Sequence, residues 1–378
     1  MKFSIWLSII FSIHCWNSFP QRFAVIGDFG SGDDNEKKVA DLVKSWNPEF
    51  VITLGDNNYY EGSVVTLDTN IGRFYSDFIF PYYGTFGTSG YKFNRFFPSL
   101  GNHDAYNNNL EVYCDYFTLP GNERYYDFEK GLVHFFVLNS NPSESDGCVL
   151  NSQQAEWLKD QVIKSDSRWK IVYFHHAPYS SGYHGNSEWM QWPFDKMGVN
   201  VVLSGHDHDY ERLMINSLTY IVNGCGGAAL RDFGPVRDES CIRYCEDFGA
   251  QLVETYSDSI IFNFININDS LIDHYVLLKH PGRYVSNNIT RAIQENFDFY
   301  PNPFNGKSTI KVTVNDQSDI KLMAFDSSGR PIKIFTEQSY SPGIYYYYWR
   351  DGNLKAGVYY LVLINGEKIL YKLVTKLP

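Results

Sequence analysis

Positive charge is scarce in this sequence. Its 378 residues include 32 Lys and Arg against 43 Asp and Glu, so the formal net charge is −11. Proteins that bind the phosphate backbone of nucleic acid need basic patches, and this balance argues against nucleic acid as a partner. It does not argue against a small phosphorylated substrate that is held through metal ions.

Long apolar runs are also missing. The apolar stretch at residues 3–13 follows a single lysine and has about half the length that a membrane-spanning helix needs. It suits the apolar part of a secretory signal peptide, which we expect at residues 1–20, with cleavage between Ser12 and Gln21. A lipoprotein anchor at Cys15 is the alternative, but His14 before it is not the small residue that such a site prefers.

Cysteine is sparse, and the number beyond the expected signal peptide is odd. An exported chain can form disulfides, yet with an odd number at least one cysteine has no partner within the chain. We would first test the pair Cys114 with Cys148 and the pair Cys241 with Cys245, while Cys225 remains. Nothing in the spacing of these residues resembles a thiolate zinc site.

The pattern over residues 22–278 alternates between strands and helices. Residues 35–46 and 153–164 carry apolar side chains at helical spacing, and Ser152 suits an N-cap for the second helix. From residue 218 onward the pattern turns to strands only, which favours a mixed α/β sandwich. The apolar runs of strand length before that point are residues 22–27, 50–54, 133–140, 169–174 and 199–203.

The composition shifts near Asn287. A polar linker, predicted at residues 281–298, is followed by the Pro- and Asn-rich stretch "FYPNPFNG". The remaining residues, 299–378, form short alternating runs between glycine turns, which predicts a small all-β, immunoglobulin-like sandwich. This part contains neither His nor Cys, so it is not expected to hold a metal or thiol centre.

Polar residues of metal-ligand type stand at the ends of five strands or strand-like segments in the first part. The stretches read "VIGDFG", "TLGDNNY", "SLGNHD", "VYFHHAP" and "LSGHDHDYER". In open α/β sheets, ligands bind in the crevice outside the carboxyl ends of the strands. Carboxylate, phenol, amide and imidazole groups would meet there, which is a suitable ligand set for two metal ions. The candidates are Asp28, Asp56, Tyr59, Asn102, His175, His206 and His208.

Each stretch also has an ordinary explanation when it is taken alone. Gly-Asp after a strand is commonly a turn, "GNHD" suits a helix cap, and neighbouring histidines can be satisfied core residues. "GHDH" is more specific, because alternate residues of an extended chain point the same way. The occurrence of all five in order, each behind an apolar run, favours the metal site.

The order GD, GDxxY, GNHD, VxxH and GHxH resembles that of the metallophosphoesterase superfamily. Tyr59 in the second motif makes the chain similar to the purple acid phosphatases, and specifically to their small type with a single catalytic domain. The resemblance covers about residues 22–278 and all seven ligand positions. It implies an α/β (α+β) four-layer sandwich of mixed β-sheets flanked by helices, with the catalytic domain at residues 21–280.

The resemblance also implies how the ligands are divided. A first metal would be held by Asp28, Asp56, Tyr59 and His208. A second would be held by Asn102, His175 and His206, with Asp56 shared between the two. In VxxH, the first histidine of the pair falls on the ligand position, so His176 is expected to have a structural role.

The donor types indicate which metals fit. A phenolate is a hard anionic donor that, with carboxylates, favours a trivalent cation, so Tyr59 predicts Fe(3+) at the first site and the visible colour of the family. An amide oxygen and two imidazoles suit a divalent ion at the second site: Zn, Mn or Fe. The expected reaction is attack of a metal-bound hydroxide on phosphorus, without a nucleophilic side chain.

A general acid should protonate the departing oxygen, and imidazole suits that role. His103 within "GNHD" is one candidate, with Asp104 placed to orient its ring. His184 is the other, because a histidine nine residues after the VxxH ligand contacts substrate in the family. A surface or structural role is the alternative for each of them.

The C-terminal part has its own resemblance. "FYPNPFNG" followed by alternating strands, with "GVYYLVLINGEKILYKLV" near the end, is similar to the C-terminal sorting domain of the type IX secretion system. It implies the secretion machinery as a partner and a secreted or outer-membrane surface location. The alternative is an accessory or adhesion module of immunoglobulin type.

Together these features predict a secreted acid phosphatase that acts on small phosphorylated substrates or phosphoproteins. A phosphodiesterase or nucleotidase on the same dimetal site is the first alternative, since the fold alone does not fix the substrate. A non-catalytic surface or binding protein is the alternative of another class. The complete ligand set argues against the latter.

Overall fold

The structure is a computed structural model that describes residues 20–106, 110–279, 297–314, 317–326, 331–350, 352, 354–365 and 368–377. Residues 1–19 of the predicted signal peptide, including Cys15, lie outside the described residues, as does most of the predicted linker. No helix in the described part of the chain is long and apolar enough to cross a membrane.

Two mixed sheets form the larger part of the molecule. The first has the order β13-β12-β11-β1-β2-β3, in which β1, β2 and β3 are parallel and β11 to β13 are antiparallel. Its strands are β1 (Gln21–Ile26), β2 (Phe50–Thr53), β3 (Phe96–Pro98), β11 (Gly249–Thr255), β12 (Ser259–Asn266) and β13 (Leu271–Leu278).

The second sheet has the order β10-β8-β9-β7-β6-β5-β4, with a parallel centre formed by β5, β6, β7 and β9. Its strands are β4 (Tyr126–Lys130), β5 (Val133–Val137), β6 (Trp169–His176), β7 (Val201–Gly205), β8 (Tyr210–Ile215), β9 (Leu218–Asn223) and β10 (Ser240–Tyr244).

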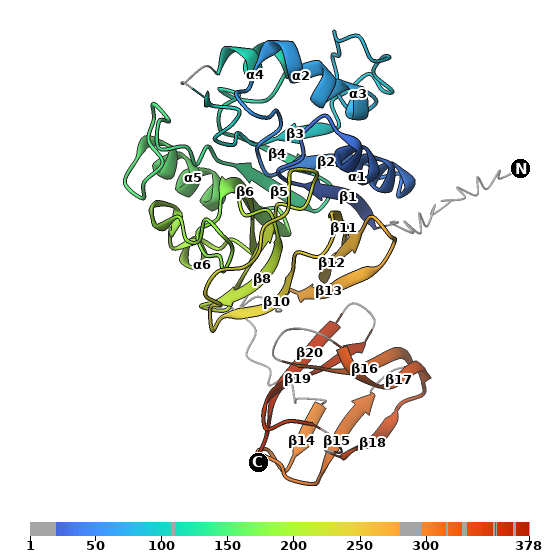
Figure 1. The fold of residues 1–378 in the computed structure, drawn as a ribbon. Helices are drawn as coiled ribbons and strands as arrows, with labels where there is room; N and C mark the ends of the chain where they lie inside the picture. Colours follow the sequence, from blue (N-terminus) through green and yellow to red (C-terminus); the bar gives the residue numbers. More distant parts are fainter. Residues whose placement is uncertain are drawn as a thin grey trace, which may run out of the picture.

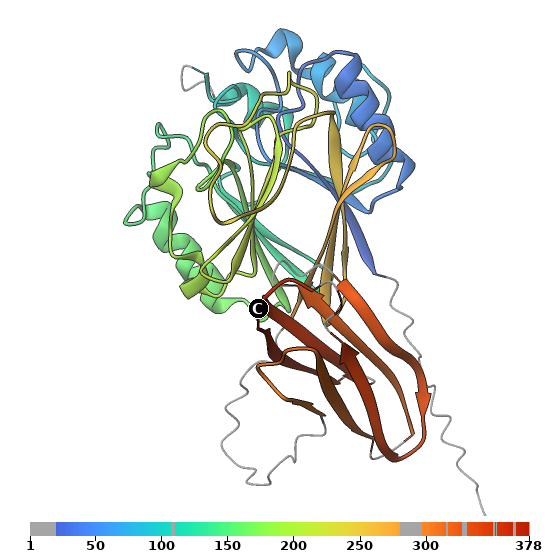
Figure 2. The ribbon, with the colours of Figure 1, turned by 60° about the horizontal axis from the view of Figure 1, so that its bottom comes forward.

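Helices cover the outer faces of these sheets (Figures 1 and 2). The helix α5 begins after Ser152, whose hydroxyl accepts a hydrogen bond from Ala155 N, as the sequence predicted. The helices are α1 (Asp34–Ser45), α2 (Val64–Asn70), α3 (Gly72–Tyr75), α4 (Glu111–Tyr116), α5 (Gln153–Lys164), the 3-10 helix η2 (Glu188–Met190) and α6 (Phe194–Met197).

Strand alternation explains the layers. Successive residues of a strand point to opposite faces, and on β5 Phe135 joins the core between the two sheets while Phe136 packs on the side of α5. Phe50 on β2 meets Phe135 edge to face, with 5.6 Å between the ring centres, so aromatic pairs join one sheet to the other. The predicted mixed α/β sandwich with flanking helices is confirmed.

The C-terminal part is all β, as predicted. It forms a three-stranded sheet of order β14-β15-β18 and a four-stranded sheet of order β17-β16-β19-β20, with a core of its own around Trp349. Its strands are β14 (Phe297–Tyr300), β15 (Lys307–Val314), β16 (Ser318–Asp326), β17 (Pro331–Tyr340), β18 (Gly343–Arg350), β19 (Gly357–Asn365) and β20 (Lys368–Lys376).

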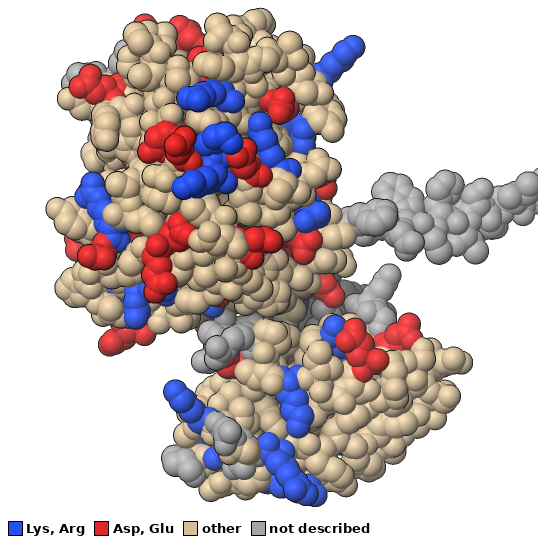
Figure 3. Space-filling view, turned by 45° about the vertical axis from the view of Figure 1, so that its right-hand side comes forward, with Lys and Arg blue, Asp and Glu red and all other residues tan. Residues whose placement is uncertain are grey.

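Charged side chains of both signs are interspersed on the face of the larger part shown in Figure 3. Lys and Arg lie among Asp and Glu there, and do not gather into one continuous basic surface. This face therefore has no stripe of the kind that tracks a nucleic-acid backbone.

The two expected disulfides are not formed. All five cysteines of the described residues are free, so both proposed pairings are wrong for this structure. Cys241 lies on β10 and Cys245 directly after it, and four residues of extended chain span roughly 13 Å. A disulfide needs Cα atoms about 4.4–6.8 Å apart, so a strand between the two cysteines prevents the bond.

Candidate metal centre

Three of the predicted ligands lie where strands of the two sheets turn sharply. Asp28 follows β1, Asp56 follows β2 and His206 follows β7, and their φ angles are 55°, 52° and 73°. Residues other than glycine rarely adopt this left-handed conformation, which costs energy and is concentrated at functional sites. The turns bring the three side chains together at the carboxyl ends of the central strands.

The glycines that open two of the motifs are needed for close approach. A Cβ atom at Gly101 would lie 2.1 Å from Oδ1 of Asp56, and one at Gly205 would lie 2.4 Å from Oδ2 of Asp28. Both positions therefore exclude any side chain. In return, His103 N donates to Asp56 Oδ1 and His206 N donates to Asp28 Oδ2, each over 2.9 Å.

The first predicted ligand group converges on one point. The phenol oxygen of Tyr59 lies 3.3 Å from Asp28 Oδ1, 3.1 Å from Asp56 Oδ2 and 3.2 Å from His208 Nε2. His208 Nε2 lies 3.6 Å from Asp28 Oδ1. Four donor atoms at these separations surround a position that suits a single cation.

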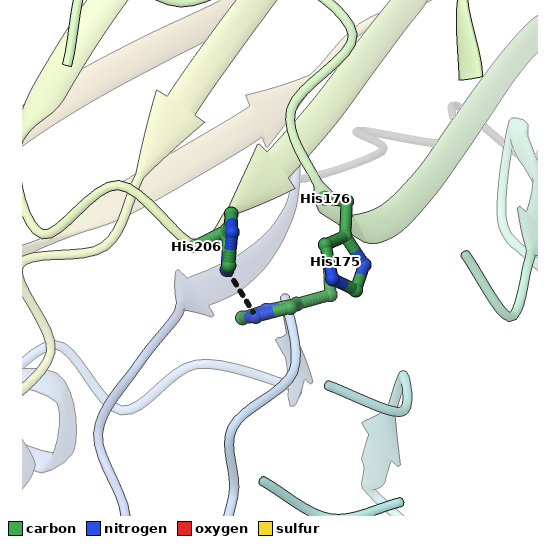
Figure 4. A group of neighbouring side chains, drawn as sticks. All are labelled: His175, His176 and His206. Carbon is green, nitrogen blue, oxygen red and sulfur yellow. Dashed lines mark hydrogen bonds between the residues drawn. The ribbon is translucent and has the colours of Figure 1, made fainter. Parts of the chain in front are cut away.

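The second predicted group converges in the same way. His175 Nε2 lies 3.0 Å from Asn102 Oδ1, 3.1 Å from His206 Nδ1 and 3.4 Å from Asp56 Oδ2. Figure 4 shows the contact between His175 on β6 and His206 at the end of β7 as a dashed line. Oδ2 of Asp56 is therefore the one atom that both groups share.

In two of the histidines, the ring nitrogen that faces away from the other ligands is held by a backbone carbonyl, which fixes the orientation of the ring. His175 Nδ1 lies 2.8 Å from the carbonyl of Leu54, and His208 Nδ1 lies 2.7 Å from the carbonyl of Ala229. A carbonyl accepts only from an N–H, so each ring carries a proton on Nδ1 and turns Nε2 toward the other ligands. Metal-binding histidines are commonly held in this way.

The buried carboxylates of the centre favour a positive charge beside them. Burial raises the pKa of Asp28 well above its usual range. Burial opposes a charged imidazole, yet Asp56 and Asp28 together raise the pKa of His175 to about 9. Two buried carboxylates thus favour the protonated ring of His175, and a bound cation would neutralise the same negative charge.

Tyr59 responds in the opposite sense. Burial, together with the charges of Asp56 and Asp28, raises the pKa of its phenol well above 10. The phenol keeps its proton unless a cation of high charge lies beside it, which fits the expectation of Fe(3+) at the first position. The residues present therefore fit two cations: oxygen-rich donors at one position, and an amide with two imidazoles at the other.

His103 lies at the edge of the first group. Its Nδ1 lies 2.5 Å from the carbonyl of Tyr60, and its Nε2 lies 3.9 Å from Asp56 Oδ2. The side chain is 29% exposed. One nitrogen is thus anchored to backbone while the other faces the crevice and remains accessible to a substrate.

The expected role of Asp104 is wrong. Its buried carboxylate accepts hydrogen bonds from the backbone N–H of Gly101 and from both the N–H and the side-chain amide of Asn57. The carbonyl of Tyr60, and not Asp104, orients the ring of His103. Asp104 ties the "GNHD" turn to the "GDNNY" turn, and burial with the nearby Asp56 raises its pKa to about 6.

His184 lies on the opposite side, in a loop after β6. Its ring stacks on that of His206, with 4.2 Å between ring centres and 28° between planes. Its backbone N–H donates to Asp207 Oδ1 over 2.6 Å, which fixes the loop. The structure therefore brings His184 beside the second ligand group, as His103 is beside the first.

His176 has the structural contacts that the sequence led us to expect. Its Nδ1 lies 2.8 Å from the hydroxyl of Ser140, and its N–H donates to the same oxygen over 2.9 Å. Burial lowers its pKa to about 3. His176 also offers a nitrogen within 4.8 Å of ligand atoms of His175 and His206 (Figure 4), so it lies directly behind the second group.

Several residues at the crevice were not identified from the sequence. Asn57 supports Asp104, although it stands between the ligands Asp56 and Tyr59 in the motif. Arg231 and Tyr183 lie at the rim, and their separation by 48 positions leaves no local pattern. Only the position of Tyr183 next to His184 could have drawn attention to it.

Comparison with known proteins shows that the chain is similar in sequence to several purple acid phosphatases. The chain is 26% identical over 265 residues to purple acid phosphatase 15 of Arabidopsis thaliana, covering 62% of this chain and 48% of that protein. It is 27% identical to purple acid phosphatase 17 of the same plant, covering 57% and 71%. It is 23% identical to human tartrate-resistant acid phosphatase type 5, covering 54% and 72%. The chain thus spans about half the length of the first of these relatives.

Solved structures show the same fold. GAP50, described as the anchor in the inner membrane complex of Plasmodium, matches with a TM-score of 0.57 at 19% identity, over 70% of this chain and 90% of that one. A purple acid phosphatase from yellow lupin (Lupinus luteus) seeds matches with a TM-score of 0.54 at 16% identity, over 68% and 54%.

Family models match both parts of the chain. The secretion system C-terminal sorting domain covers residues 298–376, which confirms the predicted sorting domain and implies export by a secretion machinery. The calcineurin-like phosphoesterase model covers residues 21–210, half of the sequence, and includes every predicted ligand. The chain therefore belongs to the calcineurin-like phosphoesterase family, with homologues among the purple acid phosphatases and a C-terminal secretion sorting domain.

Proposed function

We propose that this protein is a secreted phosphatase that hydrolyses phosphate monoesters at a two-metal site of the purple acid phosphatase type. The observation that carries the proposal is the position of Asp56, whose Oδ2 lies 3.1 Å from the phenol oxygen of Tyr59 and 3.4 Å from His175 Nε2. A single carboxylate oxygen shared by two ligand groups is the arrangement that a dinuclear centre needs.

We propose the division of the ligands that the resemblance implies. Fe(3+) would be held by Asp28, Asp56, Tyr59 and His208, and Zn, Mn or Fe(2+) by Asp56, Asn102, His175 and His206. Two bound cations would neutralise the phosphate oxygens and lower the pKa of water at the centre. The protein contributes the fixed positions of these donors, because backbone N–H and C=O groups hold each carboxylate and two of the imidazoles.

Proton transfer to the leaving alcohol falls to a histidine. Nδ1 of His103 donates to the carbonyl of Tyr60, so in the imidazolium form the proton on Nε2 is the one that can be given to the leaving oxygen. His184 is placed to contact the substrate from the side of His206. We assign the general acid to His103 and a substrate contact to His184.

Two other functions are alternatives to this proposal. A phosphodiesterase or nucleotidase would use the same centre, and the pocket around it would decide between them. A non-catalytic binding role is the alternative of another class, and the fold also occurs in a Plasmodium protein that is described as an anchor. The complete ligand set favours catalysis.

The C-terminal domain sets the place of action. The sorting domain implies contact with the secretion machinery and a secreted or surface location. We propose that residues 21–280 act there on small phosphorylated molecules or phosphoproteins, while residues 299–378 serve export.

The test is hydrolysis of p-nitrophenyl phosphate against bis-p-nitrophenyl phosphate, from pH 4 to 9, with the mature chain. The proposal expects a strong preference for the monoester. A preference for the diester would transfer the function to phosphodiester cleavage. Absence of turnover of either compound, in protein with both metals bound, would favour the binding role.

A further inference from the structure

One cation lies at the rim of the metal crevice without an acidic partner. Arg231 is half-buried in the loop after β9, and its Cζ lies 4.7 Å from the centre of the Tyr183 ring. Within the described residues, no Asp or Glu forms an ion pair with its guanidinium, whereas Arg237 on the same loop pairs with Glu239.

Arg231 is connected to the metal ligands by short contacts. Its backbone N–H donates to the carbonyl of His208 over 3.1 Å. The ring of Tyr183, on which its side chain lies, meets the ring of His184 edge to face at 5.2 Å, and His184 stacks on His206. The backbone of Arg231 thus contacts a ligand of the first group, and the rings of Tyr183 and His184 connect its side chain to His206 of the second.

The rim that carries these residues is tied together before any substrate binds. Gly234 N donates to the carbonyl of Ser181 over 2.8 Å, and Arg237 N donates to the hydroxyl of Ser181 over 3.0 Å. Ser181 in turn donates to the buried carboxylate of Glu211. The loop of Tyr183 and the loop of Arg231 therefore form one unit, and a group on it is pre-positioned.

The geometry points to a second anion subsite made by Arg231 and Tyr183, which selects small substrates that carry another phosphate beyond the one hydrolysed. A guanidinium that lies on a ring face keeps its N–H edge free for a phosphate, which it can bind with two parallel hydrogen bonds. The inference rests on the proposed function, and it narrows the substrate class to bisphosphorylated and polyphosphorylated small molecules.

Arg237 provides a matched control. It belongs to the same loop and also lies over a tyrosine, with its Cζ 5.4 Å from the Tyr179 ring centre. Its guanidinium, however, is engaged by Glu239 at 3.2 Å and by Asn186 at 3.3 Å. Arg237→Gln therefore removes one positive charge and one ring contact from this loop without removing the proposed subsite.

The test compares binding of propane-1,3-diphosphonate and propylphosphonate to the full mature chain with its metals, by calorimetry. Both probes offer one phosphonate to the metals, and only the first offers a second to Arg231. We expect wild type and Arg237→Gln to bind the diphosphonate at least tenfold more tightly. We expect Arg231→Gln to lose this preference, and Arg231→Lys to recover part of it.

Several results would overturn the subsite. They are equal binding of the two probes by wild type, an unchanged preference in Arg231→Gln, or an equal loss in Arg237→Gln. Because binding is measured without turnover, the outcome is separate from the proposed function, which p-nitrophenyl phosphate hydrolysis tests. Thermal unfolding of each variant identifies a loss of preference that comes from a damaged fold. Tyr183→Phe keeps the ring under the guanidinium and should retain the preference for the diphosphonate.

Discussion

The phenol oxygen of Tyr59 lies 3.1 Å from Oδ2 of Asp56. Both groups are buried, and burial together with the charges of Asp56 and Asp28 raises the pKa of the Tyr59 phenol well above 10, so the phenolate needs a cation beside it. The two residues are three positions apart in one turn, so a single loop after β2 supplies a phenol and the shared carboxylate to the centre. This pair connects the proposed iron site to the proposed second metal.

Tyr59→Phe tests the phenolate ligand. Because the charge-transfer band expected of the family needs the phenolate oxygen, the variant should lose visible absorption while it remains folded. Absorption spectra and circular dichroism of the purified proteins measure this. Tyr60→Phe is the matched control. Tyr60 is 80% exposed, so this variant should keep the visible absorption of wild type. An unchanged band in Tyr59→Phe would remove this residue from the ligand set.

Asp56→Asn tests the shared carboxylate. An amide cannot supply the bridging negative charge, so both metals should bind more weakly, and kcat should fall by more than the roughly 100-fold that a change behind the ligands costs. Metal analysis and phosphatase assays measure the two effects. Asp68→Asn is the control, because Asp68 accepts from Tyr82 and Tyr116 outside the crevice and should leave metal content intact.

His103→Gln tests the general acid. If Nε2 of His103 protonates the leaving oxygen, the variant should lose roughly 10²-fold in kcat for an alkyl phosphate, and far less for p-nitrophenyl phosphate, whose leaving group needs no proton. Comparing the two substrates measures this. The same selective loss in His184→Gln, with none in His103→Gln, would reverse the assignment of roles.

The buried carboxyl of Glu36 should make the stability of the folded protein depend on pH. It is buried on α1, and burial raises its pKa well above the usual value, so it is protonated in the folded state at pH values where it ionises in the unfolded state. Its contribution to stability is complete below about pH 4 and is lost as the pH rises through the folded pKa. Glu36→Gln should therefore have a higher Tm than wild type at pH 8, and the advantage should shrink at pH 5.

Differential scanning calorimetry across this pH range checks the sign. A difference of 1 kcal/mol shifts Tm by about 2–4 °C in a domain of this size. Glu156→Gln, an exposed change on α5, should alter Tm little at any pH. A Glu36→Gln advantage that grows toward acid pH would contradict the stated cause.

Residues 298–376 should be sufficient for export. Fused to an unrelated periplasmic protein in a bacterium that has the matching secretion system, they should bring it to the cell surface. Trp349→Ala should abolish this, because Trp349 is buried against Phe299 and Phe304 and its loss costs about 3–5 kcal/mol. Surface protease accessibility measures the result, and a fusion retained in the periplasm would contradict it.

The parts that the sequence predicted well depend on local patterns. Helix α5 has the predicted bounds, because the apolar spacing and the cap at Ser152 are both encoded between residues 152 and 164. The convergence of the candidate ligands could be predicted for the same reason. Each lies at or just after the end of an apolar strand, and parallel strands meet at one edge, so short motifs bring together residues that lie far apart in the chain.

The parts that were missed depend on contacts between distant segments. Asp104 stands next to His103, but the turn directs its carboxylate to Asn57. Cys241 and Cys245 are neighbours in sequence, yet extended chain separates them. The contact of Arg231 with Tyr183 arises only when two loops are tied together through Ser181, which no local pattern encodes.

The most direct test is to titrate the metal-depleted mature chain with metal and to follow p-nitrophenyl phosphate hydrolysis at each step. The account predicts that activity develops as two metal ions bind per chain and reaches its full value when both positions are filled. Full activity with one metal or none, or a chain with two bound metals that hydrolyses no phosphate ester, would contradict it.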